Sequence, residues 1–417
     1  MSFENSALRD RTKLTREVVA RNASYLEWGT QPSIFKRYPK FCYRISMEAV
    51  PSLQWLAHIR KVTDIRKIGD APYCRLNVPS AGNLHPIEMY VQARNVTGVL
   101  DGVYHVDSLE QELVLIREIE RDGIEPDVGL EYRMNGLVLF FSIVPFRSFW
   151  KYSLRSWRYC YLDLGHQIGN FFSAAEYFSQ TISPLAIESG VQLSERFGFV
   201  RDEYIAAAYA LGIPGVKKAL KMEADLMHVH PCGYSYHERT LHSLREHEPL
   251  YTKLASTKEW YWESGRNASR RSARDFGEEA LGEEGVREVI AMLHSETLEV
   301  VHVVLRVRNM QDGVYRNGQC VEEGNFLAEI YRLLVEQKFI ARSGMVSLIY
   351  GKRFDAHTHI EAGMFVQRMY QLCGRHEIGC SGIGAFYDDE AARWSDNPLI
   401  YAAAIGVQND GRDSKRD

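Results

Sequence analysis

The sequence lacks the features of nucleic-acid-binding, membrane-spanning and secreted proteins. Its 50 Lys and Arg against 54 Asp and Glu leave a net charge of −4, so no positive surplus would attract nucleic acid or an anionic membrane. The longest apolar run, Leu137 to Phe146, is about half a membrane span and predicts a buried strand. Residues 1–22 contain no apolar segment of the signal-peptide type. We expect a cytoplasmic protein without nucleic-acid or membrane partners.

The cysteines form no recognisable metal or disulfide pattern. There are seven, an odd number, with no Cys-x-x-Cys pair: Cys42, Cys74, Cys160, Cys232, Cys320, Cys373 and Cys380. This usage excludes a disulfide framework and fits a reducing compartment. The pair His357 and His359 has no nearby third ligand, so the sequence predicts no metal site.

The 417 residues instead carry an internal repeat, which organises the whole chain. With 45% apolar and 25% charged residues, the chain is typical of a globular protein and long enough for two cores. Four stretches recur: Asp101–Tyr104 as Asp312–Tyr315, the helix from Leu162 to Ser179 as Glu361–Cys373, the strand Tyr204–Gly212 as Leu399–Gly406, and the helix Ser46–Arg60 as Gly277–His294. Further expectations are a helix over residues 12–30 and strands over 89–93 and 137–144. The pattern predicts an α+β protein with an arm (1–45), a first copy (46–215), a connector (216–268) and a second copy (269–417).

A loop of small residues in the first copy suits a flat ligand. Pro79, Ser80, Ala81, Gly82 and Asn83 form its centre, and Pro86 closes it. A planar ring can lie against such a backbone, with the Asn83 amide bonding the polar edge of the ring. The alternative is an ordinary proline-bounded turn.

The second copy contains a basic heptamer, residues 270–276, and a glycine-rich stretch, residues 379–384. Arg270, Arg271, Ser272 and Arg274 can together grip a phosphate dianion, because guanidinium groups offer paired N–H donors. In the stretch around Gly382, Ile383 and Gly384, positive φ angles would turn backbone N–H groups toward a ligand. The alternatives are a solvated surface turn and a tight helix-to-strand turn. The first copy has Thr181–Ala186 at the corresponding place, without a glycine.

Lys151 and Tyr152 lie between a predicted buried strand and a long helix, among aromatic residues. A lysine desolvated by aromatic neighbours can have a lowered pKa and act as a base. The alternative is a lysine whose stem packs on apolar surface while its ammonium reaches water.

These segments together resemble the flavin-dependent nitroreductase superfamily, and within it the SagB-type dehydrogenases, which are thiazoline and oxazoline oxidases of peptide natural-product biosynthesis. The resemblance covers most of the chain: the arm Leu26–Pro39, the ring loop Pro79–Glu88, Lys151-Tyr152 with the helix Arg158–Asn170, and Arg270–Phe276 with Gly379–Glu390.

The resemblance implies a nitroreductase-like fold in two tandem copies that form a pseudo-dimer. It also implies FMN, with its phosphate on Arg270, Arg271, Ser272 and Arg274 and its ring on Pro79–Asn83 and Gly382–Gly384. No single copy has the whole motif set, so we expect one intact and one degenerate flavin site.

The implied activity is oxidation of an azoline to an azole, with a hydride passing to flavin N5 and Lys151 or Tyr152 assisting proton removal. The implied partners are a peptide or small-molecule biosynthetic intermediate and other enzymes of the pathway. The chain would act as a monomeric pseudo-dimer or a homodimer of it. Two alternatives stay open: an NAD(P)H-dependent nitro, quinone or ene reductase, and a catalytically silent scaffold that recognises a substrate.

Overall fold

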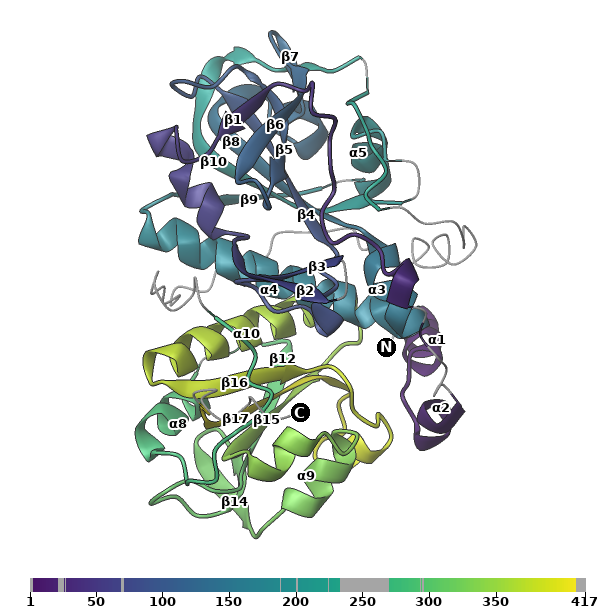
Figure 1. Cartoon of the computed structure of the whole chain (residues 1–417), viewed down its shortest axis with the longest axis vertical. Helices are drawn as coiled ribbons and strands as arrows, with labels where there is room; N and C mark the ends of the chain where they lie inside the picture. The colour runs from purple at the N-terminus through teal and green to yellow at the C-terminus, as the bar shows by residue number, and fades with distance from the viewer. Residues whose placement is uncertain are drawn as a thin grey trace. The chain divides into compact units, whose positions relative to one another are not determined.

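The chain divides into two compact units, shown in the computed structural model of Figure 1. Unit 1 comprises Met1–Leu26 and Glu263–Asp417, and unit 2 comprises Glu27–Trp262. The structure describes residues 3–21, 26, 28–68, 71–187, 189–199, 202–223, 225–232, 270–292, 294 and 296–409. Most of the expected connector, residues 233–268, therefore lies outside the described residues.

Unit 2 is built on a seven-stranded sheet whose neighbouring strands are all antiparallel. Across the sheet the strands are β1 (Arg44–Ser46), β6 (Glu112–Glu118), β5 (Gly102–Asp107), β4 (Ile87–Arg94), β8 (Tyr132–Ile143), β10 (Tyr204–Lys218) and β9 (Ser183–Leu185). The predicted strands 89–93 and 137–144 fall within β4 and β8, apart from Val144. β4 is buried along its whole length, including its polar residues Glu88, Gln92 and Arg94.

Helices and short hairpins complete unit 2. The helices are α3 (Pro145–Tyr152), α4 (Ser156–Tyr177) and α5 (Gly190–Arg196), and the 3₁₀ turns are η1 (Trp28–Thr30), η2 (Pro51–His58), η3 (Ala81–Asn83), η4 (Glu125–Val128) and η5 (Ser153–Arg155). Two strand pairs lie outside the main sheet: β2 (Val62–Ile68) with β3 (Ala71–Leu76), and β7 (Asp122–Gly123) with β11 (Leu220–Lys221). α4 packs on β4, β8 and α3, and nearly all of its residues are buried.

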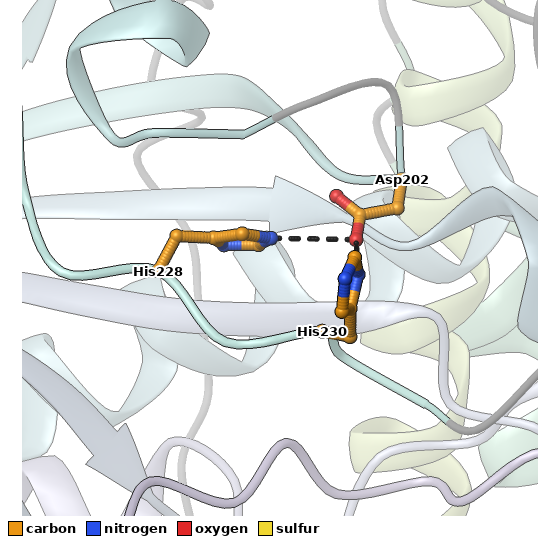
Figure 2. A group of neighbouring side chains, drawn as sticks. All are labelled: Asp202, His228 and His230. Atoms are coloured by element: carbon orange, nitrogen blue, oxygen red, sulfur yellow. Dashed lines mark hydrogen bonds and ion pairs between the residues drawn. The ribbon is translucent and has the colours of Figure 1, made fainter.

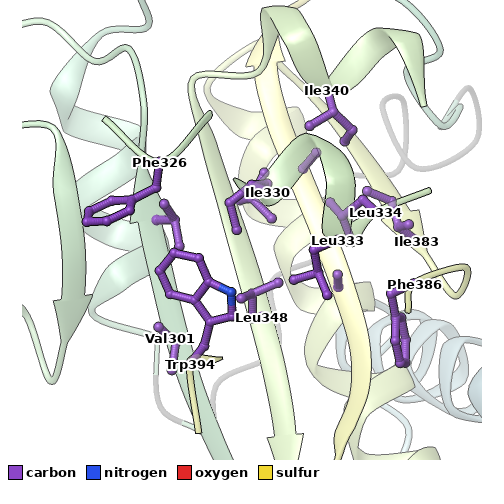
Figure 3. Close-up of a cluster of buried hydrophobic side chains, with 14 of the residues drawn as sticks. Val301, Phe326, Ile330, Leu333, Leu334, Ile340, Leu348, Ile383, Phe386 and Trp394 are labelled. Atoms are coloured by element: carbon purple, nitrogen blue, oxygen red, sulfur yellow. The ribbon is translucent and has the colours of Figure 1, made fainter. Parts of the chain in front are cut away.

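Unit 1 has a six-stranded antiparallel sheet. Its strands are, in order, β14 (Gln319–Glu323), β13 (Gly313–Arg316), β12 (Leu298–Val304), β15 (Met345–Gly351), β17 (Leu399–Val407) and β16 (Ile378–Ile383). Around it are α1 (Phe3–Arg11), α2 (Arg16–Arg21), α8 (Glu283–Ile290), α9 (Leu327–Leu333), α10 (Ala356–Arg375), η6 (Lys338–Arg342) and η7 (Glu390–Arg393). Side chains from α9 and from the strands form the core shown in Figure 3, where Trp394, Phe326 and Leu348 pack together.

The strand orders of the two sheets confirm the duplication. Six strands of unit 2 (β6, β5, β4, β8, β10, β9) occur in the same order as β14, β13, β12, β15, β17 and β16 of unit 1. The register agrees as well, because Val91 faces Tyr104 as His302 faces Tyr315. Even a side-chain bond is repeated: each tyrosine donates from its hydroxyl to the carbonyl four residues earlier, at 2.7 Å and 2.9 Å. The predicted α+β class and tandem copies are therefore confirmed.

Three predicted helices have different bounds. The helix expected over 12–30 is instead α1, a break at residues 12–15, α2 and η1; the break occurs because Thr15 Oγ1 accepts the Val18 N–H and starts a new helix. The helix expected over Ser46–Arg60 is the 3₁₀ turn η2, since Pro51 is tolerated only in a first helical turn. The helix expected over 277–294 is α8, which begins only after Gly282.

The glycine-rich stretch 379–384 was expected to be a loop and is the strand β16. It pairs along its length with β17, with Gly382 opposite Ala403. Gly384 follows the strand, and none of Gly379, Gly382 and Gly384 has a positive φ angle. The prediction of a loop was therefore wrong for residues 379–383, and the expected positive φ angles are not found. Among the described residues, no helix is both long enough and apolar enough to cross a membrane.

Candidate functional site

In unit 2 the ring loop lies directly against Lys151 and Tyr152. Ala81–Asn83 form a 3₁₀ turn in which Gly82 has a φ of 63°. A β-carbon built on Gly82 would lie 2.6 Å from Tyr152 Oη and 3.3 Å from the Lys151 side chain. Only glycine fits this position, because its backbone is left-handed and the phenol occupies the space of a side chain. Two motifs about 70 residues apart in the sequence thus meet.

Asp163 on α4, which the sequence reasoning overlooked, anchors the ring loop. Its carboxylate accepts from Ser80 Oγ at 2.5 Å and from the Ala81 N–H at 3.3 Å. Ser80 Oγ in turn accepts from the His85 N–H at 2.8 Å. Burial raises the pKa of Asp163 to about 7, although the Ser80 bond works in the opposite direction. The loop conformation is therefore coupled to a carboxyl group that titrates near neutrality.

Both ends of the Asn83 side chain have partners inside unit 2. Its amide N donates to the Cys74 carbonyl at 2.8 Å, and its amide O lies 3.1 Å from His85 Nε2. The expected bond from Asn83 to a ring edge would therefore have to share or replace one of these.

The pKa of Asp163 gives a stability prediction. Because the folded-state pKa is above the ordinary 3.8, the folded chain binds more protons between pH 4 and 7, and the free energy of unfolding falls as pH rises through that window. The shift corresponds to a loss on the order of 4 kcal/mol by pH 8. We expect Asp163→Asn to remove this loss, so its Tm relative to the unaltered chain should rise from pH 4 to pH 8. Thermal denaturation at both pH values tests this, with the exposed Glu131→Gln as control. An unchanged Tm difference would contradict it.

Aromatic rings surround Lys151. Its Nζ lies 5.2 Å from the Trp28 ring centroid and 5.5 Å from that of Tyr152. Trp28 meets Trp150 edge-to-face at 5.7 Å, and Trp150 Nε1 donates to Thr30 Oγ1 at 2.9 Å, which fixes the arm to α3. The aromatic faces stabilise the ammonium form of the lysine. Trp28 is 59% exposed, so an apolar surface beside Lys151 remains open to solvent.

In unit 1 the basic heptamer packs around Tyr370 of α10. The Arg270 guanidinium stacks on the Tyr370 ring at 4.9 Å. The Tyr370 hydroxyl lies 2.7 Å from Ser272 Oγ and accepts from the Gly382 N–H at 2.7 Å. The structure thus brings together three of the predicted cofactor-binding residues, Arg270, Ser272 and Gly382. Arg271 and Arg274 are exposed at the surface. Tyr370 itself was not predicted.

The first copy cannot form the same arrangement. The register that aligns β10 with β17 places Pro184 of β9 at the position of Gly382 of β16. Aligning Gly165 with Gly363 places Phe172 at the position of Tyr370. Proline has no N–H and phenylalanine has no hydroxyl, so the first copy lacks both the donor and the acceptor of the hydrogen bond that joins Gly382 to Tyr370 in the second copy. The structure therefore restricts this arrangement around Tyr370 to the second copy.

The remaining histidine pair of the sequence analysis, His357 and His359, lies on α10. His357 pairs with Glu361 at 3.4 Å, and the buried His359 places Nδ1 2.7 Å from the Asp355 carbonyl. The partner of His357 is on α10, and that of His359 is the N-cap residue of the same helix.

No family model matches the chain. A protein of Methanocaldococcus jannaschii assigned as a nitroreductase is 32% identical over 108 residues, which are 24% of this chain and 51% of that protein. The chain thus spans about half the length of this curated relative.

Solved structures extend the likeness to nearly the whole chain. A protein of Anabaena variabilis assigned as a nitroreductase matches with a TM-score of 0.77 at 19% identity, covering 97% of this chain and 99% of that one. A chain of the E. coli microcin synthetase McbBCD complex matches at 15% identity over 51% of this chain and 93% of that one; its TM-score of 0.33 is too low to support an inference. The chain therefore has the nitroreductase-like fold, in two tandem copies.

Proposed function

We propose that the chain is an FMN-dependent dehydrogenase of the SagB type, which oxidises an azoline or a related amino-acid-derived ring in a peptide or small-molecule biosynthetic intermediate. The observation that carries the proposal is the packing of Gly82 against Lys151 and Tyr152. It supports the proposal because the two groups that we propose for proton transfer lie beside a loop suited to a flat ring. The nitroreductase-like fold supports an oxidoreductase.

Each unit, taken by itself, carries residues of the kind that one part of FMN would need. In unit 1, Arg270, Arg271, Ser272 and Arg274 offer cationic and hydroxyl donors to a phosphate, with Arg270 oriented by Tyr370. In unit 2, the side-chain-free Gly82 and its small neighbours offer a backbone surface to the ring. Bound FMN would supply two-electron redox chemistry by accepting a hydride.

The oxidation of an azoline removes a hydride and a proton, and this chain must manage the proton. The rings of Trp28 and Tyr152 stabilise the Lys151 ammonium, which by itself disfavours Lys151 as the base. A neighbouring positive charge lowers the pKa of a phenol. We therefore propose that the ionised Tyr152 hydroxyl removes the substrate proton. Lys151 is then the cation that favours the ionised form of Tyr152.

The proposal predicts one FMN per chain, because Phe172 and Pro184 remove the corresponding arrangement from the first copy. The purified full-length chain is reconstituted with FMN, and flavin absorbance is compared with protein concentration. A peptide bearing a thiazoline is then added anaerobically. We expect loss of the oxidised-flavin band and formation of the thiazole.

The other outcomes distinguish the alternatives. Bleaching by NAD(P)H but not by thiazoline peptides would replace the proposal with a nitro, quinone or ene reductase. A chain that binds no FMN after reconstitution would instead be a recognition scaffold. Two flavins per chain would contradict the assignment of a degenerate first copy.

A further inference from the structure

Two histidines and a carboxylate meet in unit 2, in a cluster separate from the ring loop. Asp202 lies two residues before β10, and His228 and His230 lie on the segment 225–232, which is neither helix nor strand. Asp202 Oδ2 is 3.3 Å from His228 Nε2 and 2.9 Å from His230 Nδ1 (Figure 2). Both imidazoles point toward the same carboxylate oxygen, one from each side chain of this His-x-His pair.

The Asp202 carboxylate is buried and incompletely satisfied. Only 1% of the residue is exposed, and its second oxygen, Oδ1, has no hydrogen-bond partner among the described residues. A buried carboxylate oxygen without a partner is costly, and a cation held by both oxygens of Asp202 would satisfy Oδ1 as well as Oδ2.

We propose that Asp202, His228 and His230 bind a divalent transition metal ion of the Zn²⁺ type. The three donor atoms all lie within 4.8 Å of one another. Zn²⁺ takes imidazole and carboxylate ligands at about 2.0–2.2 Å, and a tetrahedral site of that size separates its donors by about 3.3 Å. The two measured separations, 2.9 and 3.3 Å, are close to that value. The side chain of His230 is 78% exposed, which leaves room for a water ligand.

One contact opposes binding. Lys36 Nζ lies 3.2 Å from His228 Nδ1, 2.7 Å from Glu203 Oε2 and 2.8 Å from Tyr90 Oη. An ammonium only donates, so without metal His228 keeps its proton on Nε2 and gives it to Asp202. A metal on Nε2 moves the imidazole proton to Nδ1, and Lys36 must then withdraw toward Glu203 and Tyr90. Both acceptors are buried and already bonded to it, so the ammonium keeps two partners.

The ion would have a structural role. It would link the residue that leads into β10 to the segment 225–232, which is otherwise joined to unit 2 by contacts such as Tyr38 Oη with the Met227 carbonyl, at 3.2 Å. This role does not depend on the proposed redox activity, and flavin absorbance should not change with the metal.

The test is titration of the chelator-treated full-length chain with Zn²⁺ by calorimetry, and with Co²⁺ by absorbance. We expect one ion per chain and a Co²⁺ spectrum of a tetrahedral site. Loss of a residue that only orients a metal ligand weakens metal binding by up to about 100-fold. His230→Ala and Asp202→Asn each remove a ligand itself, so each should weaken Zn²⁺ binding by about that factor. Since His230 is exposed, its replacement should leave folding intact, which circular dichroism checks.

Two controls locate the ion. His357→Ala changes a His-x-His pair in unit 1 and should bind Zn²⁺ like the unaltered chain. A variant with His237, His242 and His247 all changed to Gln, at positions outside the described residues, should also bind normally. The proposal is overturned if the chain binds no Zn²⁺, if His230→Ala binds it undiminished, or if the triple variant loses it.

Discussion

Lys151→Ala should retain FMN and yet lose turnover, with about 10²–10⁴-fold, the contribution of positioned proton transfer itself, as the upper bound. Lys151 lies beside the ring loop, at the end of α3, and none of the four residues proposed to hold the phosphate is altered. The variant loses the cation that favours the ionised Tyr152 hydroxyl. The rate of thiazole formation and the flavin-to-protein ratio measure the two parts of this prediction separately.

A comparison with Tyr152→Phe identifies which group carries the proton. If Tyr152 is the base and Lys151 tunes it, Tyr152→Phe should lose activity at every pH, whereas Lys151→Ala should regain part of it as pH rises toward the ordinary pKa of tyrosine, about 10. Lys217→Ala, on an exposed part of β10, serves as the matched lysine control. Full activity of Lys151→Ala would refute the assignment, and recovery by Tyr152→Phe at high pH would make Lys151 the base.

The duplication could be predicted because short sequence patterns of turns and strands recur in the two copies. Asp101–Tyr104 and Asp312–Tyr315 each start a strand with the same turn, and the two copies repeat both the register and the tyrosine-to-carbonyl bond. Small-residue strands such as Leu399–Val407 are equally visible, since a buried central strand reads as a continuous apolar run.

The glycine-rich stretch shows where local patterns fail. Its glycines permit a loop, but tertiary pairing with β17 makes Ile378–Ile383 a strand. Glycine is needed at residue 382 for a different reason: a β-carbon there would collide with the Tyr401 hydroxyl. That reason depends on a partner strand and is invisible in the stretch itself.

The residues that sequence reasoning missed are those whose role depends on a distant partner. Tyr370 is one of 23 tyrosines and gains significance only through Ser272 and Gly382. Asp163 is one of two acidic residues in α4, and its role appears only when Ser80 is found beside it. For the metal cluster a signal was present, because His228 and His230 are spaced as a ligand pair, but Asp202 becomes the third ligand only in the fold.

Arg271→Ala should strip most FMN from the chain. A hydrogen bond to a charged group contributes about 1.5–3 kcal/mol, so losing one guanidinium should weaken FMN binding by roughly 10- to 150-fold. Arg271 is exposed, and its replacement leaves the Tyr370 bonds with Ser272 and Gly382 unchanged. Fluorescence titration with FMN gives the affinity, and parallel titration with riboflavin, which lacks the phosphate, should show little difference between variant and parent.

The matched control is Arg342→Ala, which removes a guanidinium near the same segment but outside the proposed phosphate-binding set. Arg342 pairs with Asp275 at 3.5 Å and Glu278 at 3.1 Å and is 44% exposed. It should keep the FMN affinity of the parent, since surface ion pairs of this kind contribute little. A second variant, Tyr370→Phe, places phenylalanine where the first copy has Phe172. It removes the hydroxyl that contacts Ser272 and Gly382, so this variant should also bind FMN weakly. Undiminished FMN affinity in both Arg271→Ala and Tyr370→Phe would show that the heptamer does not bind the FMN phosphate. A loss of affinity confined to Tyr370→Phe would instead mean that Arg270 and Ser272 bind the phosphate without Arg271.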